Sequence, residues 1–263
     1  MISGILEEMN MDDVRALDPQ VALLGVASTE PHGPILPYGT DHFQCDAVCR
    51  RAAVRANAEG GRVLMYPTLA IGNNVNFKGF PFACRISVRT LMLVLLDIIQ
   101  ALEEDGIRKI VLIDGHGGNT DAIHATLREH FDRTPADRRA FVCVTRPPAS
   151  PEAVAAVRIP SDHGGESEVS RMMYLHPELI DEGKLRELPV GRPVVEFIAA
   201  GEVEYVKPWH RHVPEGGGGE TRHATADKGR DIIETAADRL AEMLVELSNA
   251  PWNPEFPYPP VKR

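Results

Sequence analysis

The stretch Val21–Asp41, VALLGVASTEPHGPILPYGTD, carries the first strand and the first polar cluster of this chain. Its first six residues, VALLGV, form a short apolar run, which is typical of a strand buried on both faces of a sheet. Glu30, His32 and Asp41 follow on a segment that contains three prolines. Carboxylate oxygens mixed with imidazole nitrogens suit a divalent first-row metal such as zinc, manganese or iron. The stretch therefore predicts a metal-binding segment directly after a buried strand.

Short apolar runs alternate with helical patterns along the rest of the chain. Further strands are expected over 62–71, 109–114 and 140–145, and helices over 41–59, 88–105, 119–131 and 226–247. Such alternation implies right-handed crossovers and a largely parallel sheet covered by helices. The expected fold class is α/β, with one domain over residues 1–263. After residue 145 the pattern loosens, and 146–160, rich in Pro and Ala, is expected to form a loop over the site.

The bulk composition excludes several classes of protein. A net charge of −10 disfavours a nucleic-acid surface, which needs clustered Lys and Arg. The most apolar stretch, Leu91–Leu102, is interrupted by Asp97 and Gln100 and is too short to span a bilayer. No basic segment followed by an apolar one marks a signal peptide, and the four scattered cysteines indicate reduced core thiols. We expect a soluble, cytoplasmic protein that binds neither nucleic acid nor membrane.

A second polar cluster follows the expected strand over 109–114. It reads DGHGGN over Asp114–Asn119, and the glycines on both sides of His116 leave its imidazole pointing into open space. A phosphate-binding loop or a plain strand-to-helix turn is an alternative interpretation, although the P-loop and dinucleotide patterns are absent. Parallel strands place ligands beyond their carboxyl ends. We therefore expect Glu30 and His116 to reach the same rim of the sheet.

A third cluster, SDHGGESEVS over Ser161–Ser170, leads into a helical pattern. Glu166 and Glu168 would occupy the first turn, where the helix dipole favours acidic residues in any case. Residues two apart on a helix face different ways, so at most one of the two glutamates should point into the site. Glu166, which follows the flexible Gly-Gly pair, is the one expected to do so.

Together, the three clusters resemble the signature motifs of the creatininase family of metal-dependent amidohydrolases. The matching segments are EPHGP with GTD (30–34 and 39–41), GHGGN (115–119), HGGESEVS (163–170) and, more weakly, ATADKG (224–229). The resemblance spans roughly residues 20 to 240. It implies a creatininase-like three-layer fold with a mostly parallel central sheet, and a homo-oligomer, hexameric in that family.

The resemblance also implies two divalent metal ions per subunit, with zinc favoured and manganese or iron as alternatives. Glu30 and His116 would hold one ion, His32 would hold the other, and Asp41 would bridge both. In creatininase the second ion has a further glutamate ligand two residues after the histidine of the second motif, where this chain has Gly118. The branch with the GHGGN motif replaces that ligand with a glutamate of the third motif, which is Glu166 here.

A second departure from the family pattern affects the substrate pocket. Many members have a histidine and then Phe-Pro-Gly-Thr after the second strand, whereas this chain reads NNVNFKGFPFAC over 73–84. Asn74, Asn76 and Lys78 are candidate substrate contacts, with a solvated loop as the alternative. The substrate is therefore expected to differ from creatinine.

The expected reaction is hydrolysis of a C–N bond in a small cyclic or linear amide. Two metals sharing a hydroxide would provide the nucleophile, and Asp41 would fix their separation. His163 or Glu168 would pass a proton to the leaving nitrogen. Three alternatives remain open: opening of a cyclic ketone such as a keto-inositol, removal of a formyl group, and a non-catalytic protein that binds a small anion.

Overall fold

The computed structural model describes residues 3–157 and 163–260. Within them, four parallel strands form a sheet in the order β2-β1-β3-β4. The strands are β1 (Val21–Val26), β2 (Val63–Leu69), β3 (Lys109–Asp114) and β4 (Phe141–Thr145). The expected α/β fold with a parallel sheet is thereby confirmed.

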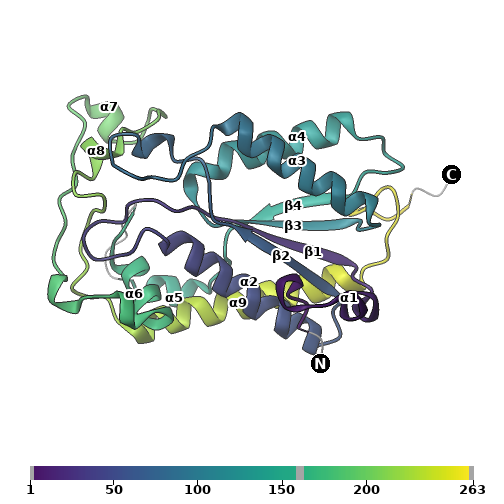
Figure 1. Cartoon of the computed structure of the whole chain (residues 1–263). Helices are drawn as coiled ribbons and strands as arrows, with labels where there is room; N and C mark the ends of the chain where they lie inside the picture. Colours follow the sequence, from purple (N-terminus) through teal and green to yellow (C-terminus); the bar gives the residue numbers. More distant parts are fainter. Residues whose placement is uncertain (1–2, 158–162, 261–263) are drawn as a thin grey trace.

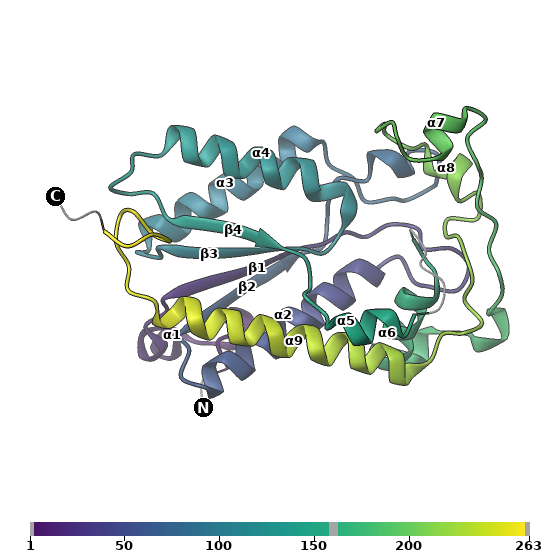
Figure 2. The ribbon, with the colours of Figure 1, turned by 180° about the vertical axis from the view of Figure 1, so that it is seen from behind.

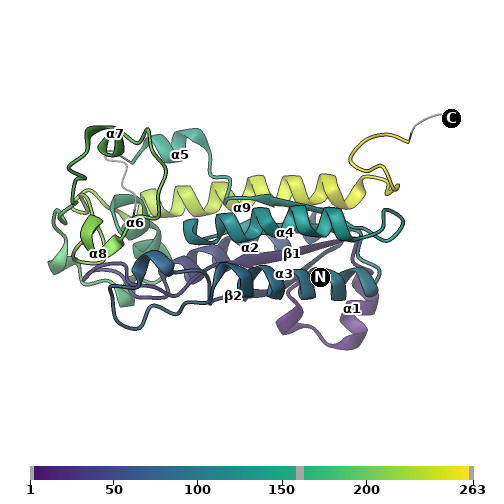
Figure 3. The ribbon, with the colours of Figure 1, turned by 90° about the horizontal axis from the view of Figure 1, so that it is seen from above.

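Helices cover both faces of the sheet and make three layers (Figure 1). α3 (Val88–Glu104) and α4 (Thr120–Arg133) lie on one face, and α2 (Thr40–Ala58) and α9 (Ala226–Asn249) lie on the other. Figure 3 shows α3 and α4 running along the sheet beside each other. The remaining α-helices are α1 (Met11–Leu17), α5 (Pro151–Ala155), α6 (Glu166–Leu175), α7 (Glu196–Ala199) and α8 (Trp209–His212).

The continuous apolar character of β1 follows from burial on both faces. Val21 and Leu23 belong to the core formed with α2 and α9, while Ala22, Leu24 and Val26 belong to the core formed with α3 and α4. Because successive side chains of a strand alternate between faces, a strand between two helical layers needs apolar residues at every position. β1 therefore occupies an interior position, between β2 and β3.

The long helices have the caps and stripes that their sequences predict. The Ser87 hydroxyl accepts a hydrogen bond from the backbone N–H of Thr90 and caps α3. Leu91, Leu95 and Ile99 then form a buried stripe against the sheet. This stripe packs α3 against the sheet.

The carboxyl ends of the strands point toward α6, α7, α8 and the long connections around them (Figure 2). A smaller core lies under this region, where Ile35 and Leu36 of the segment after β1 pack with Val169 and Met172 of α6 and with Leu188. This core fixes the start of α6 beside the segment that follows β1.

Other expectations are met in part. Cys45 and Cys49 are buried core thiols as predicted, but Cys84 is exposed. The expected loop over 146–160 contains the short helix α5, and its last residues, 158–160, lie outside the described ones, as do Ser161 and Asp162 of the third cluster. No helix in the described parts of the chain is long and apolar enough to cross a membrane.

Candidate metal centre

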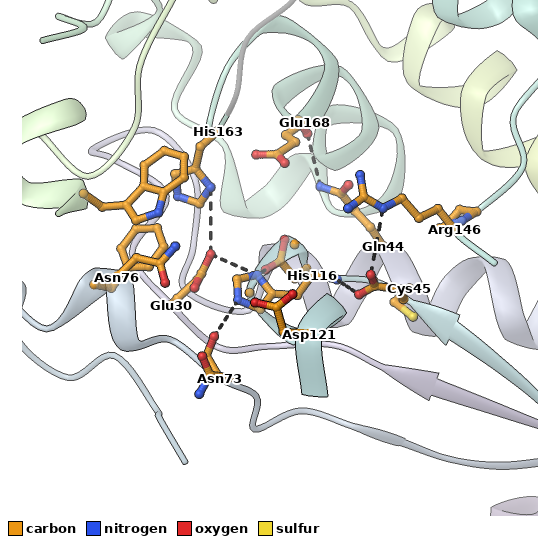
Figure 4. A pocket seen from close by; sticks show the side chains of 18 of the residues that line it. Glu30, Gln44, Cys45, Asn73, Asn76, His116, Asp121, Arg146, His163 and Glu168 are labelled. Carbon is orange, nitrogen blue, oxygen red and sulfur yellow. Dashed lines mark hydrogen bonds and ion pairs between the residues drawn. The ribbon is translucent and has the colours of Figure 1, made fainter. Parts of the chain in front are cut away.

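Six ionisable side chains converge at the carboxyl edge of the sheet, and Figure 4 labels Glu30, His116, His163 and Glu168 among them. They come from the segment after β1, the first turn of α2, the turn after β3 and the start of α6, and they are Glu30, His32, Asp41, His116, His163 and Glu168. The prediction that Glu30 and His116 reach the same rim is confirmed by the ion-pair contact between them.

Glu30, Asp41 and His116 form a first group, whose candidate ligand atoms lie within 4.8 Å of one another. His116 Nδ1 is 3.0 Å from Asp41 Oδ2 and 3.3 Å from Glu30 Oε1. His116 Nε2 is 3.2 Å from the carbonyl oxygen of Asn73. Because a carbonyl can only accept, the neutral ring carries its proton on Nε2 and turns the Nδ1 lone pair toward the two carboxylates.

His32, Asp41 and Glu168 form a second group with the same property. His32 Nε2 is 3.2 Å from Asp41 Oδ1 and 3.6 Å from Glu168 Oε2. The other ring nitrogen, Nδ1, donates to the carbonyl oxygen of Glu30 at 3.0 Å. Asp41 therefore belongs to both groups and presents one carboxylate oxygen to each histidine.

The buried carboxylates of the two groups favour a bound cation. Burial alone would lower the pKa of His32, but Asp41, Glu168 and Glu30 outweigh it and raise this pKa to about 9. Burial and the negative charge of Asp41 both raise the pKa of Glu30. Burial would raise the pKa of Asp41, yet His32 and His116 lower it overall. Protons or a metal ion must neutralise three carboxylates in this space.

The orphaned atoms of the cluster also fit a metal. Among the described residues, Glu30 Oε2, His32 Nε2 and Asp41 Oδ2 are buried without a well-aligned hydrogen bond. Buried polar atoms without partners are costly. Oxygen and imidazole donors in this number suit zinc or manganese, and backbone carbonyls orient the histidines as outer partners do around bound metals.

His163 lies directly beside this cluster. Its ring centre is 4.0 Å from that of His32, and Nδ1 is 3.8 Å from Glu30 Oε1. Nε2 donates to the carbonyl oxygen of Pro31 at 2.7 Å. Burial, followed by the charge of His32, lowers the pKa of His163 to about 4. At neutral pH the ring is therefore uncharged, and the Nδ1 lone pair can accept a proton. His163 also forms a third possible ligand group with Glu30 and His32.

The expectation that Glu166 points into the site was wrong. Glu166 is fully buried and pairs with Lys228 of α9, whose Nζ lies 2.5 Å from Oε1. Glu168 reaches the cluster instead, and its Oε2 accepts a hydrogen bond of 2.7 Å from the backbone N–H of Gly164. The physical reason is the helical phase: α6 begins at Glu166, so this side chain turns toward α9 and the one two residues later turns toward the rim.

The three candidate substrate contacts have different positions. Asn74 is fully buried, and its side-chain amide is hydrogen-bonded within the protein. The amide oxygen accepts from the Ser28 hydroxyl, and the amide nitrogen donates to the carbonyl oxygens of Thr29 and Cys84. Lys78 is exposed and does not line the cavity beside the cluster. The expectation of substrate contact was therefore wrong for both residues. Asn76 does line the cavity.

The cavity beside the cluster has a volume of about 670 Å³ and includes residues that the sequence reasoning missed. Phe77 and Trp209 stack with ring centres 5.4 Å apart and form a wall beside His163. Arg146, the first residue after β4, lines the cavity as well. The rule that predicted Glu30 and His116 applies to Arg146 too, whereas no local pattern indicates Trp209.

A close approach of backbones explains the run of four glycines over 216–219. A Cβ on Gly217 would lie 3.2 Å from the carbonyl oxygen of His32, and a Cβ on Gly164, whose φ is +71°, would lie 3.0 Å from the Cα of Gly217. The backbone N–H of Gly218 also donates to the carbonyl oxygen of His163 at 2.9 Å. The glycine run thus holds the first and third motifs together.

Comparison with known proteins agrees with this architecture. The sequence model of the creatininase family, described as creatinine amidohydrolase, matches residues 7–244. Creatinine amidohydrolase from Pseudomonas putida is 28% identical over 242 residues, which are 86% of this chain and 89% of that protein. The mycofactocin precursor peptide peptidase from Mycolicibacterium smegmatis is 30% identical over 165 residues, 62% of this chain and 61% of that protein.

Solved structures share the fold over almost the whole chain. A creatinine amidohydrolase-type protein from Bacteroides fragilis has a TM-score of 0.84 at 25% identity, covering 96% of this chain and 99% of its own. A creatininase structure described as the Zn-Zn type has a TM-score of 0.75 at 24% identity and covers 94% of this chain and 99% of its own. A creatininase structure described as the Mn form has a TM-score of 0.74 at 24% identity and covers 94% of this chain and 100% of its own. The match of the family model over residues 7–244 shows that the chain belongs to the creatininase family of amidohydrolases.

Proposed function

We propose that this protein hydrolyses a C–N bond of a small amide by means of two divalent metal ions per subunit. The observation that carries the proposal is the position of Asp41, whose two oxygens face two separate histidines at 3.2 Å and 3.0 Å. A carboxylate shared in this way is suited to bridge two ions, since two-metal sites hold their ions about 3.5–4 Å apart.

The ligand assignment follows the two groups that share Asp41. Glu30 and His116 would complete one site, and His32 and Glu168 would complete the other. Zinc is the favoured ion and manganese the next, which agrees with the donor atoms and with the metals named for the creatininase structures. When bound, such ions lower the pKa of water and polarise a substrate carbonyl.

His163 is the proposed proton carrier. Glu168 is engaged by Gly164 and faces His32, so the remaining group that can accept and return a proton is His163 Nδ1. Its lone pair is available at neutral pH because the pKa is lowered to about 4. The hydrogen bond from Nε2 to Pro31 fixes the ring orientation, so that a proton taken from water can be delivered to the leaving nitrogen.

The substrate is proposed to differ from creatinine because position 118 cannot carry a side chain in this structure. A Cβ on Gly118 would lie 2.2 Å from the carbonyl oxygen of Asn73 and 2.4 Å from His116 Nε2. A glutamate ligand at this position would therefore displace His116. Glu168 supplies the missing carboxylate from another side of the cavity, which changes the space left for substrate.

Metal-dependent turnover tests the proposal. The protein is stripped with a chelator, reloaded with zinc or manganese, and assayed on lactams including creatinine, formamides, small linear amides and cyclic ketones. We expect hydrolysis of one of the amide classes, loss of activity on chelation, and recovery on reloading. Activity that survives exhaustive chelation, or normal turnover in Asp41→Ala, would contradict the proposal, and turnover of cyclic ketones alone would assign a different bond.

We also propose that the protein is a homo-oligomer, by resemblance a hexamer. Exposed apolar side chains near the carboxyl edge support an assembly, among them Val194, Phe197 and Val206. Light scattering during size-exclusion chromatography should give a mass several times 28.9 kDa; the mass of one chain would contradict it.

A further inference from the structure

We propose that Arg146 binds a carboxylate group of the substrate, so that the protein acts on amides that carry a negative charge. This inference rests on the proposed function and specifies its substrate class. Arg146 is the first residue beyond the carboxyl end of β4 and lines the cavity of the metal cluster. It therefore holds the same topological position on β4 that the ligand segments hold on β1 and β3.

The guanidinium group of Arg146 makes only long contacts with the described protein. Its Nε lies 3.9 Å from Asp114 Oδ2, beyond hydrogen-bond distance, and Nη2 makes only a long contact of 3.4 Å with Thr120 Oγ1. Asp114 already accepts a hydrogen bond of 2.6 Å from the Thr120 hydroxyl. The arginine side chain is 70% exposed, and the residue lines the cavity. Asp114 thus orients one edge of the guanidinium and leaves the outer N–H groups for a ligand.

Several other arginines of this chain make short ion pairs with carboxylates. Arg50 contacts three carboxylates at 2.6 to 2.7 Å, and Arg62 and Arg222 each contact one at 2.5 Å. At the rim of the cavity, Arg146 makes only the 3.9 Å contact with Asp114, whereas Arg171 faces Glu168, a carboxylate of the metal cluster, at 4.0 Å. An arginine fork is the side chain best matched to a carboxylate.

The charge of the cavity wall also favours an anion. Arg171 and Lys207 line the same cavity as Arg146, and the acidic residues of the wall outside the metal cluster are Asp114 and Asp121. The carboxylates of the cluster itself would be neutralised by two divalent ions. The metal-loaded cavity is therefore net positive, and the excess is small enough to suit a single carboxylate.

The geometry places the two ends of such a substrate. In Figure 4, Arg146 extends into the pocket from the side of β4, while His163 and Asn76 lie on the other side of Glu30. A substrate with its carbonyl at the metal cluster would direct one end toward Arg146 and the other toward the wall of Phe77 and Trp209. The apolar wall would take the uncharged end.

Binding of a matched pair of ligands without an amide bond tests this inference. The probes are 4-oxopentanoate and 5-hydroxypentan-2-one, which share a methyl ketone and differ in a carboxylate against a hydroxymethyl group. Affinities are measured by calorimetry on the zinc-loaded protein. We expect the carboxylate to bind at least about tenfold more tightly, as a charge-assisted hydrogen bond provides.

Variants separate Arg146 from the metals as the source of that preference. Arg146→Gln should lose most of the preference, and Arg146→Lys should keep part of it because the charge remains without the fork. Arg133→Gln is the matched control: this side chain is 74% exposed and lies at the far end of α4, about 20 Å from the turn beside the cavity. It should leave the preference intact.

Three results would overturn the inference: equal affinities for the two probes, no binding of either, or a carboxylate preference that persists in Arg146→Gln and so belongs to the metals. The titration measures binding without turnover. A protein that binds 4-oxopentanoate through Arg146 but hydrolyses no amide would refute the proposed function alone. A protein that hydrolyses amides but shows no such preference would refute this inference alone.

Discussion

Replacing Glu166 or Glu168 singly by glutamine should have two different effects. Glu168→Gln should weaken metal binding, and Glu166→Gln should lower the stability of the fold. Glu168→Gln removes a carboxylate whose Oε2 faces His32 at 3.6 Å, and glutamine can still accept the hydrogen bond from Gly164. Losing a ligand should weaken the second metal site by more than about 100-fold, because losing an outer partner alone costs about 10–100-fold. The metal-free protein should be as stable as the wild type, since one of three crowded carboxylates becomes neutral.

Glu166→Gln should have the opposite pattern. This carboxylate is fully buried and pairs with Lys228, whose side chain is 19% exposed. Breaking a buried pair costs about 3–5 kcal/mol, and the glutamine oxygen can still accept from lysine, so we expect about 3 kcal/mol. For a chain of this size the midpoint of thermal unfolding should fall by roughly 6–12 °C. Metal content should remain that of the wild type.

Elemental analysis and thermal unfolding of the metal-free proteins measure both effects on the same samples. Two ions per chain retained in Glu168→Gln would refute the assignment of this residue. A loss of one ion in Glu166→Gln with unchanged stability would refute the account of both residues, and the side chain predicted from sequence would then be the ligand after all.

Three further predictions concern protons, packing and catalysis. Zinc binding near pH 7.5 should release about one proton or more, because the pKa of His32 in the metal-free folded protein is about 9 and its ring is charged at that pH. The contribution of this charge to the free energy of unfolding is complete below pH 6.5 and is lost above pH 9. Calorimetry in buffers of different ionisation enthalpy measures the release, and a buffer-independent heat would contradict it. Gly229→Ala should lower the free energy of unfolding in urea by about 1–3 kcal/mol, because the added Cβ would lie 1.9 Å from the carbonyl oxygen of Ser170. This loss should outweigh the higher helix propensity of alanine. A gain in stability would contradict the packing of α6 on α9. His163→Gln should lower kcat by about 100-fold or more on any substrate found, with metal content unchanged; an unchanged kcat would exclude His163 as the proton carrier.

Sequence reasoning located the strands and the rim because their determinants are local. An apolar run such as Val21–Val26 between turn-forming residues predicts a strand buried on both faces, and the structure places it between two helical cores. The parallel arrangement then brings the segments after β1 and β3 to one edge of the sheet, which is why Glu30 and His116 were predicted as neighbours and lie 3.3 Å apart.

The errors arose where direction depends on distant partners. Glu166 and Glu168 differ by about 200° around α6, so the choice between them depends on the residue at which the helix begins and on Lys228, far along the chain. Asn74 was expected to face substrate, but in the folded loop its side-chain amide forms hydrogen bonds with Ser28 and Cys84 instead. Neither contact has a local sequence signal.

Anomalous diffraction from zinc-loaded crystals tests the central claim most directly. We expect two zinc peaks per chain about 3.5–4 Å apart, with Asp41 between them. Glu30 and His116 should bind one ion, and His32 and Glu168 the other. A single peak per chain, or a zinc ion bound by Glu166, would contradict it.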